Sequence, residues 1–402
     1  MATGSSRISG AGVGAADQRP LIAHVLFRFD YGGLENGVVN QINGMPDADF
    51  RHVVVALTVS TSFRERLRKD VEVFELRKRP GKDLPAYWRL FRLLRRLRPA
   101  VVHTRNFGTL DCAAIACLAG VPVRIHGEHG WDVFDPDGRV RKYRFVRRAL
   151  SPLVHAFVTV SKDLRTWLGS VVGIPTQKII WICNGVDTAK FHPRAADDRA
   201  ALPAGFRDGA YVIGTVTRFS AIKDPLNLVE AFIQLRARSP LSESLRLVMI
   251  GDGELRDAAL TRLRAAGLAD AAWLPGSRED IPQLLRQLDL FVLGSLREGI
   301  SNTILEAMAS GVPVVATATG GSVELIDAGR TGQLVAPGDS AALAEAIAAY
   351  AVDADLGRRH GRAARQDAET RFSLAAMIAH YRRLYQRSLL PSRSRICAES
   401  PE

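Results

Sequence analysis

The sequence, 402 residues long, lacks the features that mark several classes of protein. It has four cysteines, without the spacing of a metal or redox site, so a reducing cytoplasm is the simplest compartment. No apolar run approaches the roughly 20 residues of a membrane-spanning helix. Residues 1–19 are rich in Gly, Ala and Ser and have no apolar core, so no secretory signal is visible and we predict a disordered tail there. We predict a second tail at residues 388–402.

Acidic residues are also in short supply, and the resulting positive charge is uneven. The chain has 54 Lys and Arg against 42 Asp and Glu, a net charge of +12. Residues 77–98 hold nine basic side chains and one acid, with Trp88 and Phe91 among them, and residues 139–148 hold six more basic side chains. Basic amphipathic helices with aromatic residues dock on anionic lipid headgroups, although the same pattern fits a helix packed on its own sheet with solvated arginines.

We therefore expect an anionic membrane surface as a partner, with the protein peripheral at the inner face of the plasma membrane. No RNA- or DNA-reading motif accompanies the charge, so we expect no nucleic acid partner.

The pattern of apolar runs predicts an α/β protein of two domains. The chain is longer than one domain usually is, and strand-like runs alternate with helical segments, which is typical of parallel sheets covered on both faces. The runs lie at 21–27, 53–59, 71–76, 101–103, 123–126 and 156–160 in the first half, and at 211–216, 246–250, 272–274, 290–293 and 312–316 in the second.

These runs place an N-terminal Rossmann-like domain at residues 20–190 and a C-terminal one at 191–373. The final helix, at 374–387, has no following strand, and we expect it to pack back across the hinge. Two doubly wound domains would face each other across a cleft at the carboxyl ends of their strands, where ligands bind in such sheets.

The segment 297–321 carries the strongest functional signal. It places Glu298 just before one short helix and Glu306 within it. Between them lie residues that supply capping oxygens and free amides: Ser301, Asn302 and Thr303. A helix N-terminus suits a phosphate, and carboxylates suit neutral hydroxyls such as those of a sugar. Both kinds of group side by side indicate a sugar nucleotide as the ligand.

Two further segments are suited to bind phosphate. Gly32 and Gly33 follow a strand and open a helix, where glycine lets backbone N–H groups approach an anion. Such a pair is also common as a purely structural turn, and it is not the three-glycine dinucleotide fingerprint. Arg218 and Lys223 follow the first strand of the second half and could converge on a diphosphate. The strand end at 274–278 could line a base pocket, which makes Arg278 a donor-binding candidate.

Two histidines end a strand of the first half, in the segment His126-Gly127-Glu128-His129-Gly130. A lone histidine is usually a core residue, but two histidines and a glutamate among glycines at a strand end favour a functional role. The pattern leaves open whether His126 or His129 faces the cleft.

Together these motifs resemble those of the family 4 retaining glycosyltransferases, or glycosyl transferases group 1, which have the GT-B fold. The resemblance covers about residues 20–387. It rests on Gly32-Gly33-Leu34-Glu35, Asn184-Gly185-Val186-Asp187, Arg218 with Lys223, Gly251-Asp252-Gly253 and, above all, Glu298-x7-Glu306 followed by residues 311–316. Residues 127–130 also resemble the subgroup found with exopolysaccharide and exosortase (PEP-CTERM) systems. Ile300 departs from the family pattern, because an aromatic residue is more common there, so the fit of the donor sugar is open.

The resemblance implies a role for each candidate residue. In the catalytic group, Arg218 and Lys223 hold the diphosphate, Glu298 lies near the hydroxyls of the donor sugar, and His129 lies near the reacting carbon, with His126 as the alternative. The implied donor-binding residues are Gly33, Ser301, Asn302, Thr303 and Glu306, and the strand-end patterns described above add Gly32 and Arg278 to the donor-binding candidates. Among these, the amide of Gly33 faces the donor phosphate and Glu306 binds the ribose.

The resemblance also implies the reaction. A hexose-type sugar passes from a nucleotide-sugar to a lipid-linked or polysaccharide acceptor by front-face attack, with retention of configuration. No Asp-x-Asp motif adjoins the predicted cleft residues, so we predict no metal and no other cofactor. Two alternatives remain: a sugar-nucleotide 2-epimerase of the same architecture, and a non-catalytic nucleotide-sugar-binding scaffold.

Overall fold

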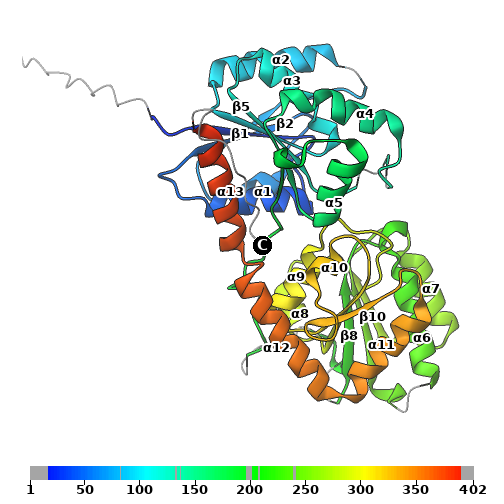
Figure 1. Ribbon diagram of the computed structural model, residues 1–402. Coiled ribbons are helices and arrows are strands. Elements are labelled where there is room, and N and C mark those ends of the chain that lie inside the picture. Colours follow the sequence, from blue (N-terminus) through cyan, green and yellow to red (C-terminus); the bar gives the residue numbers. More distant parts are fainter. Residues whose placement is uncertain are drawn as a thin grey trace, which may run out of the picture.

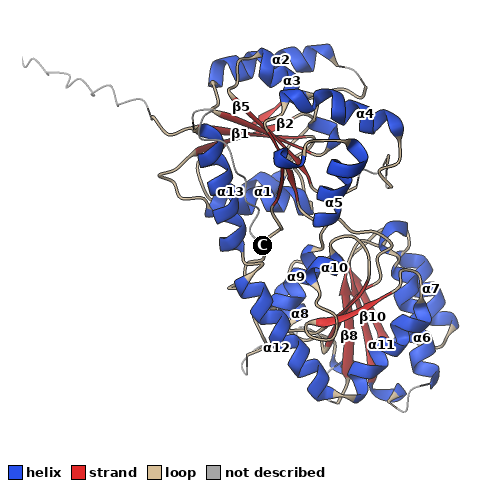
Figure 2. Ribbon diagram, viewed as in Figure 1, coloured by secondary structure: helices blue, strands red, loops and turns tan. Residues whose placement is uncertain are grey.

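The computed structural model describes residues 17–390, apart from residues 82, 132–133, 136, 196–201, 207–208 and 239–240. Residues 1–16 and 391–402, which make up most of the two predicted tails, lie outside the described residues. The described part contains two parallel sheets, each covered by helices on both faces (Figures 1 and 2). This confirms the predicted α/β architecture of two doubly wound domains.

The N-terminal sheet has seven parallel strands in the order β3-β2-β1-β4-β5-β6-β7. The strands are β1 (Leu21–Leu26), β2 (Arg51–Ala56), β3 (Glu72–Glu75), β4 (Val101–Arg105), β5 (Val123–Glu128), β6 (Ala156–Thr159) and β7 (Ile179–Trp181). β1 and β4 are buried at every position; β1 is apolar except for His24, whereas β4 ends in the polar residues His103, Thr104 and Arg105.

Four helices cover the two faces of this sheet. The helices α2 (Leu84–Leu97) and α3 (Cys112–Leu118) pack on one face through Leu90, Leu94 and Cys112. The helices α1 (Gly33–Gly44) and α13 (Leu374–Leu389) lie on the other face, and α13 contributes Tyr381 and Tyr385 to its core. At the edge of this domain stand α4 (Arg141–Leu150) and α5 (Lys162–Thr166) (Figure 1).

The C-terminal sheet has six parallel strands in the order β10-β9-β8-β11-β12-β13. The strands are β8 (Tyr211–Val216), β9 (Leu245–Ile250), β10 (Ala272–Gly276), β11 (Leu290–Leu293), β12 (Val314–Thr317) and β13 (Gly332–Val335). The helices are α6 (Pro225–Arg238), α7 (Arg256–Ala265), α8 (Ile281–Leu285), α9 (Asn302–Ala309), α10 (Ser322–Leu325), α11 (Ser340–Val352) and α12 (Ala354–Thr370). One face of the sheet packs on α6, α7 and α11, and the other on α8, α9 and α12.

The chain passes between the domains twice at one place. Val186, on the way out, exchanges backbone hydrogen bonds with the returning segment, donating to Phe372 O at 2.9 Å and accepting from Leu374 N at 2.8 Å. A Cβ atom at Gly185 would lie 2.8 Å from Leu374 Cα, so the close approach of the two segments requires glycine there. The helix α13 then continues onto the N-terminal domain beside α1, as Figure 1 shows.

Candidate active site

Both sheets reverse their strand order next to the cleft, and the predicted residues follow these reversal points. The order reverses between β1 and β4 in the first sheet and between β8 and β11 in the second. Such a switch point is where open parallel sheets bind ligands, because the two adjoining loops leave in opposite directions. Gly32 and Gly33 follow β1, Arg218 and Lys223 follow β8, and Glu298 follows β11.

Glu298 is held in place on the C-terminal side of the cleft. Its carboxylate is buried, and Oε1 accepts from Lys223 Nζ at 2.5 Å and from Ser295 Oγ at 2.7 Å. The backbone of Glu298 is also closely packed, because a Cβ atom at Gly320 would lie 1.8 Å from Glu298 O. Lys223 and Glu298 therefore form a fixed, charge-balanced pair.

The start of α9 supplies the amides that the sequence predicted. Ser301 is the N-cap residue, and its Oγ accepts from Ile304 N at 3.3 Å and lies 3.1 Å from Thr303 Oγ1. Asn302 lies in the first turn, where its Oδ1 accepts from Asn184 Nδ2 at 2.8 Å. The first turn of this helix therefore faces the place where the chain leaves the N-terminal domain.

The glycine loop of the N-terminal domain reaches the same helix start. Gly32 is the N-cap residue of α1, and a Cβ atom at Gly33 would lie 3.1 Å from Asn302 Nδ2. Two helix N-termini, one from each domain, thus meet at one point of the cleft. Arg218 follows β8 at the switch point of the C-terminal sheet, and its exposed side chain has no hydrogen-bond or ion-pair partner in the part of the chain that the structure describes. Amides from both domains and a free guanidinium suit a doubly charged phosphate group.

Beside this point lies a cleft of about 730 Å³. Glu306 and Arg278 line it from the C-terminal domain together with Lys190, and Asn36 and Asn40 line it from α1. Burial raises the pKa of Glu306 to about 7, although the nearby Lys190 lowers it. The carboxyl of Glu306 is therefore close to half-protonated at neutral pH. Arg278 pairs with Asp280 at 2.8–2.9 Å.

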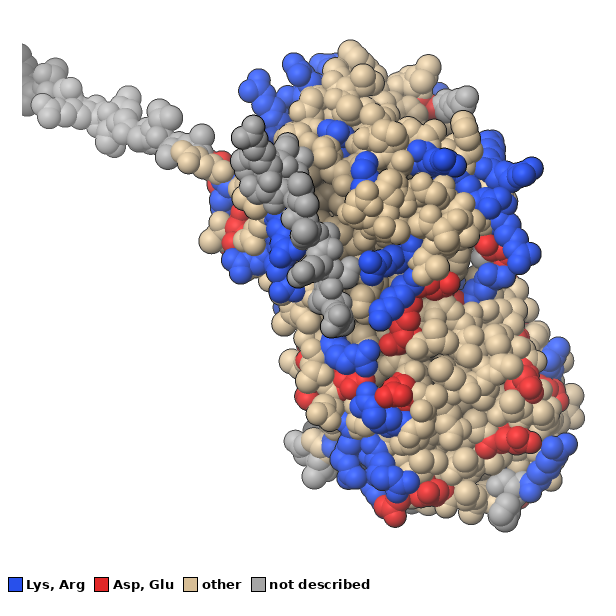
Figure 3. Space-filling model, viewed as in Figure 1, with Lys and Arg blue, Asp and Glu red and all other residues tan. Residues whose placement is uncertain are grey.

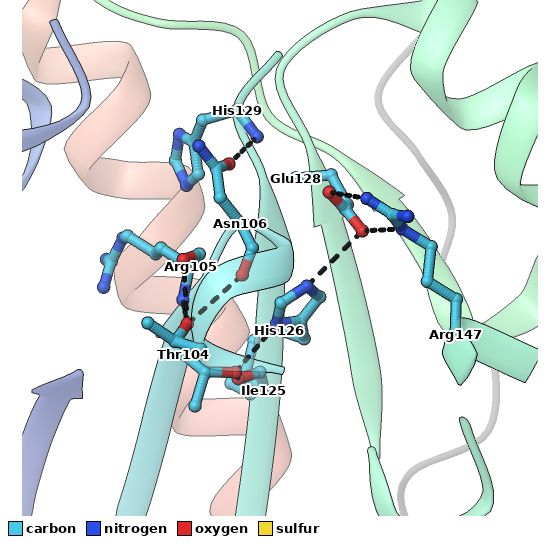
Figure 4. Close-up of polar contacts among 9 residues, drawn as sticks. Thr104, Arg105, Asn106, Ile125, His126, Glu128, His129 and Arg147 are labelled. Carbon is cyan, nitrogen blue, oxygen red and sulfur yellow. Dashed lines mark hydrogen bonds and ion pairs between the residues drawn. The ribbon is translucent and has the colours of Figure 1, made fainter. Parts of the chain in front are cut away.

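The two histidines lie in different surroundings (Figure 4). His126 is buried within β5, where Nδ1 lies 2.8 Å from Thr104 Oγ1 and Nε2 lies 3.4 Å from Glu128 Oε1. His129 follows the strand; the residue as a whole is partly exposed but its ring Nε2 is buried, and its backbone N–H donates to Asn106 Oδ1 at 2.8 Å. Burial, Arg105 and His126 lower the pKa of His129 to about 3, so its ring is neutral.

Three contacts join the domains beside His129. A Cβ atom at Gly299 would lie 3.2 Å from His129 O and 2.8 Å from Gly130 Cα. Arg297 forms an ion pair with Asp137. The Glu324 carboxylate accepts from the first two amides of α5 at 2.6 and 3.1 Å. The cleft is therefore closed on this side, and His129 lies at the line of closure.

Sequence reasoning missed a group of buried polar residues beneath His129. Arg147 of α4 donates to both oxygens of Glu128, at 2.6 and 3.3 Å, and its guanidinium stacks on Phe107 and Trp167. Burial alone would raise the pKa of Glu128, but Arg147 and His126 outweigh it and hold the pKa at about 2. Arg105, at the end of β4, is a second buried arginine in this group. The available signal was a strand that ends in a charged residue, His103-Thr104-Arg105.

One expectation about metals needs correction. An Asp-x-Asp triplet, residues 135–137, does lie close to the cleft. Asp137 pairs with Arg297, and Oδ1 of Asp135 accepts from Val140 N at 3.1 Å, whereas Oδ2 of Asp135 is buried and has no hydrogen-bond partner among the described residues. Across the described residues no cluster of three His, Cys, Asp or Glu side chains is arranged to hold a metal ion. Independence of metal stays a prediction.

Sequence models of two protein families match the chain, one on each domain. "Glycosyltransferase Family 4" matches residues 31–190, and "Glycosyl transferases group 1" matches residues 210–353. "Putative glycosyltransferase EpsD" of Bacillus subtilis (strain 168) is 29% identical over 302 residues, which cover 71% of this chain and 78% of that protein.

Two other relatives are aligned over shorter lengths. "UDP-Gal:alpha-D-GlcNAc-diphosphoundecaprenol alpha-1,3-galactosyltransferase" of Escherichia coli is 29% identical over 60% of this chain. "Lipopolysaccharide core biosynthesis mannosyltransferase LpcC" of Rhizobium leguminosarum bv. viciae is 33% identical over 53% of this chain. The chain spans 63% and 61% of the length of these two proteins.

Solved structures share the fold. Anabaena Alr3699/HepE, crystallised with UDP and glucose, has a TM-score of 0.78 and 22% identity, over 92% of this chain and all of that one. WaaG, a glycosyltransferase involved in lipopolysaccharide biosynthesis, has a TM-score of 0.71 and 14% identity, over 90% of this chain and 99% of that one. At these identities the likeness establishes the two-domain GT-B architecture.

Proposed function

The chain belongs to the family 4 glycosyltransferases, and we propose that it is a retaining enzyme that transfers a sugar from a nucleotide-sugar to a lipid-linked or polysaccharide acceptor. The observation that carries this proposal is the meeting of two helix N-termini, one from each domain, next to a cleft that Glu306 lines. We place the reaction in the assembly of exopolysaccharide or another cell-surface glycan, as the relatives' names suggest. Membership of the exosortase-associated subgroup stays a prediction.

We orient the donor along the cleft by the charges of its parts. Its diphosphate lies between the amides of Gly33 and the first turn of α9, with Arg218 and Lys223 as the cations. Its ribose hydroxyls reach Glu306, and the base occupies the cleft beside Arg278. The sugar then lies between Glu298 and His129, one on each side of the line of closure.

The geometry suits a reaction in which the leaving group is stabilised directly. Cleavage of the bond from the anomeric carbon to oxygen puts negative charge on the diphosphate, where fixed amides and cations are most effective. Glu298 is buried and bound to Lys223 and Ser295, so we assign it to the sugar hydroxyls and not to nucleophilic attack. The acceptor hydroxyl attacks from the same face, and its proton passes to the leaving phosphate.

A donor screen tests this proposal. Nucleotide-sugars with UDP, GDP, ADP or dTDP as the leaving group are tested by thermal shift, then incubated with and without polyprenyl-diphosphate saccharides. UDP-sugars come first, because the structural neighbour was crystallised with UDP. We expect one donor class to stabilise the protein and to be consumed at a high rate only with an acceptor. Consumption without any acceptor, with epimerised sugar as product, would show an epimerase, and binding without turnover would show a scaffold.

The basic surface of the N-terminal domain supports an anionic membrane as a second partner. No described helix combines the length and the hydrophobicity needed to cross a bilayer. Figure 3 shows Lys and Arg gathered over the N-terminal domain, near the positions of α2 and α4. The helix α4 is inverted relative to an ordinary surface helix, because its buried side chain is Arg147 while Phe145 is 72% exposed. Trp88 on α2 is 60% exposed among arginines. Outward aromatic rings among cations fit a lipid headgroup layer.

Vesicle flotation tests this surface. We expect the protein to float with vesicles that contain phosphatidylglycerol and not with phosphatidylcholine alone, because attraction to anionic lipid adds to apolar burial. Phe145→Ser should reduce the bound fraction several-fold, whereas Val352→Ser, an equally exposed apolar site on α11 of the other domain, should not. Equal binding to both kinds of vesicle would exclude electrostatic docking.

A further inference from the structure

Arg105 is a buried cation that lies below His129, as Figure 4 shows. It is the last residue of β4, at the switch point of the N-terminal sheet, and its side chain is 2% exposed. The side chain of the next residue, Asn106, accepts a hydrogen bond from the backbone N–H of His129. A guanidinium stays protonated even when it is buried. A full positive charge is therefore fixed beneath the candidate active site.

Each hydrogen bond of Arg105 goes to a neutral acceptor. Nη2 donates to Gln41 Oε1 at 2.9 Å, and Nη1 donates to His24 Nδ1 at 3.1 Å and to His103 O at 3.4 Å. Nε is buried and has no partner among the described residues. Because Arg105 has only donors, His24 Nδ1 must accept, so the proton of this neutral ring is on Nε2 and is shared with His52 Nδ1 at 3.0 Å.

The neighbouring histidines are neutral, so they neither balance the charge of Arg105 nor add to it. Burial and the charge of Arg105 lower the pKa of His24 and of His103 well below the usual value. His129 is neutral for the same two reasons. The charge of Arg105 is thus the one uncompensated charge in this group of described residues.

The nearest carboxyls are not available to balance this charge. Glu128 is already paired with Arg147, which is buried to the same degree as Arg105. Glu35, at the start of α1, folds back over Gly32, where a Cβ atom would lie 2.2 Å from its Oε2. Burial raises the pKa of Glu35, although Arg105 lowers it, and the two side chains form no ion pair. A buried charge without a counter-ion is costly and is seldom kept unless a ligand supplies the partner.

We propose that Arg105 is a positioning residue for the transfer reaction, and that its buried charge is balanced by the diphosphate of the nucleotide-sugar donor. This inference rests on the proposed function. Arg105 contributes to donor binding from the N-terminal domain without touching the donor. Arg105 lies below the Gly32–Gly33 loop and His129, and its positive charge attracts the diphosphate electrostatically from there. Arg218 and Lys223 supply the contacts from the opposite domain.

The test compares charged and neutral ligands in variants of Arg105. Dissociation constants are measured by calorimetry for UDP, GDP and ADP, and for uridine, guanosine and adenosine. Two charges roughly 10 Å apart in a protein interior interact strongly enough to change binding by about 10-fold or more. We expect Arg105→Met to weaken the binding of the preferred nucleoside diphosphate by at least that factor and to leave the matching nucleoside within about twofold. Arg105→Lys keeps the charge and should restore most of the diphosphate affinity.

A structural control separates charge from packing. Gln41→Leu removes the bond from Arg105 and the bond to Tyr385 Oη at 2.8 Å, but it keeps the arginine. We expect this variant to lower the melting temperature and to retain the preference for diphosphate over nucleoside. If Arg105→Met does not fold, Arg105→Gln takes its place. Equal diphosphate affinity in wild type and the neutral variant, or equal losses in Arg105→Met and Arg105→Lys, would overturn the inference. Failure of the wild-type protein to bind any of the three nucleoside diphosphates would instead refute the proposed function.

Discussion

Glu306 gives the sharpest prediction, because its burial has opposite effects on stability and on binding. Burial raises its pKa from 4.5 to about 7. That change corresponds to at most about 3 kcal/mol of unfolding free energy. The folded protein favours the protonated carboxyl of Glu306, whereas the unfolded chain ionises it above about pH 4.5. Ionisation of Glu306 therefore lowers the free energy of unfolding. This loss is absent below about pH 4.5, grows up to about pH 7 and is constant above that pH. Glu306→Gln should therefore raise the melting temperature at pH 8 by up to roughly 6–12 °C and leave it unchanged at pH 4.

The same substitution, Glu306→Gln, should weaken the binding of the nucleotide-sugar donor. Ribose hydroxyls donate to a carboxylate, which favours its charged form and lowers its pKa. Nucleotide binding at pH 7 should therefore release a fraction of a proton, and affinity should rise from pH 6 to pH 8. Calorimetry in two buffers of different ionisation enthalpy measures the released proton. In Glu306→Gln both the proton release and the rise in affinity should disappear.

The outcome that refutes this reasoning is simple to recognise. Glu345→Gln on the exposed face of α11 controls for the removal of one negative charge, and we expect it to shift the melting temperature equally at all pH values. If Glu306→Gln gives the same small shift at pH 4 and pH 8 as this control, the carboxyl of Glu306 is ionised in the folded protein. The assignment of its raised pKa would then be wrong.

Three other substitutions test the site directly. Lys223→Ala should cost about 100-fold in turnover, the scale for losing one fixed donor to a developing charge, and activity within twofold of wild type would refute its role. Gly299→Ala introduces a Cβ atom 2.8 Å from Gly130 Cα, so it should reduce kcat at an unchanged melting temperature; an unaffected kcat would show that the two loops separate during turnover. Glu324→Gln weakens the contact of its carboxylate with the amides of α5, so the radius of gyration from solution scattering should increase, and an identical profile would exclude a part for this contact in domain closure.

Much of the C-terminal half of the site was predictable, because its residues are close in the sequence. Glu298, the N-cap Ser301 and Glu306 lie within one loop and one helix, so the periodicity of a helix fixes their relative positions. Gly311 follows this helix with φ of 71°, a left-handed conformation that favours glycine, so the end of the helix is also visible in the sequence. The strands 211–216 and 290–293 were predicted with the bounds that the structure has.

The N-terminal half was less predictable for two physical reasons. The strand β7 has only three residues and is partly exposed, so its apolar run is too short to indicate a strand; β13 of the C-terminal domain, with four residues, was missed for the same reason. The contacts of Arg105 come from β1, α1 and β4, up to 81 residues apart in the chain. A single sequence shows a charged residue at a strand end and does not show whether an acid lies beside it in space. The sequence therefore pointed to His126 and His129 and missed the buried charge between them and α1.

The charges of the two domains account for the arrangement of the cleft. On the C-terminal side, Glu298 is balanced by Lys223 and Glu306 is close to half-protonated, while Arg218 has no acidic partner among the described residues. On the N-terminal side, Arg105 is likewise unbalanced. Each domain thus has a buried or exposed guanidinium without an acidic partner, and Arg66 and Arg68 add further positive charge to the N-terminal wall of the cleft. Like charges on the two sides oppose closure of the cleft. A diphosphate between them reverses the sign of that interaction, so we infer that the donor, rather than the uncharged sugar of the acceptor, provides the free energy that closes the two domains.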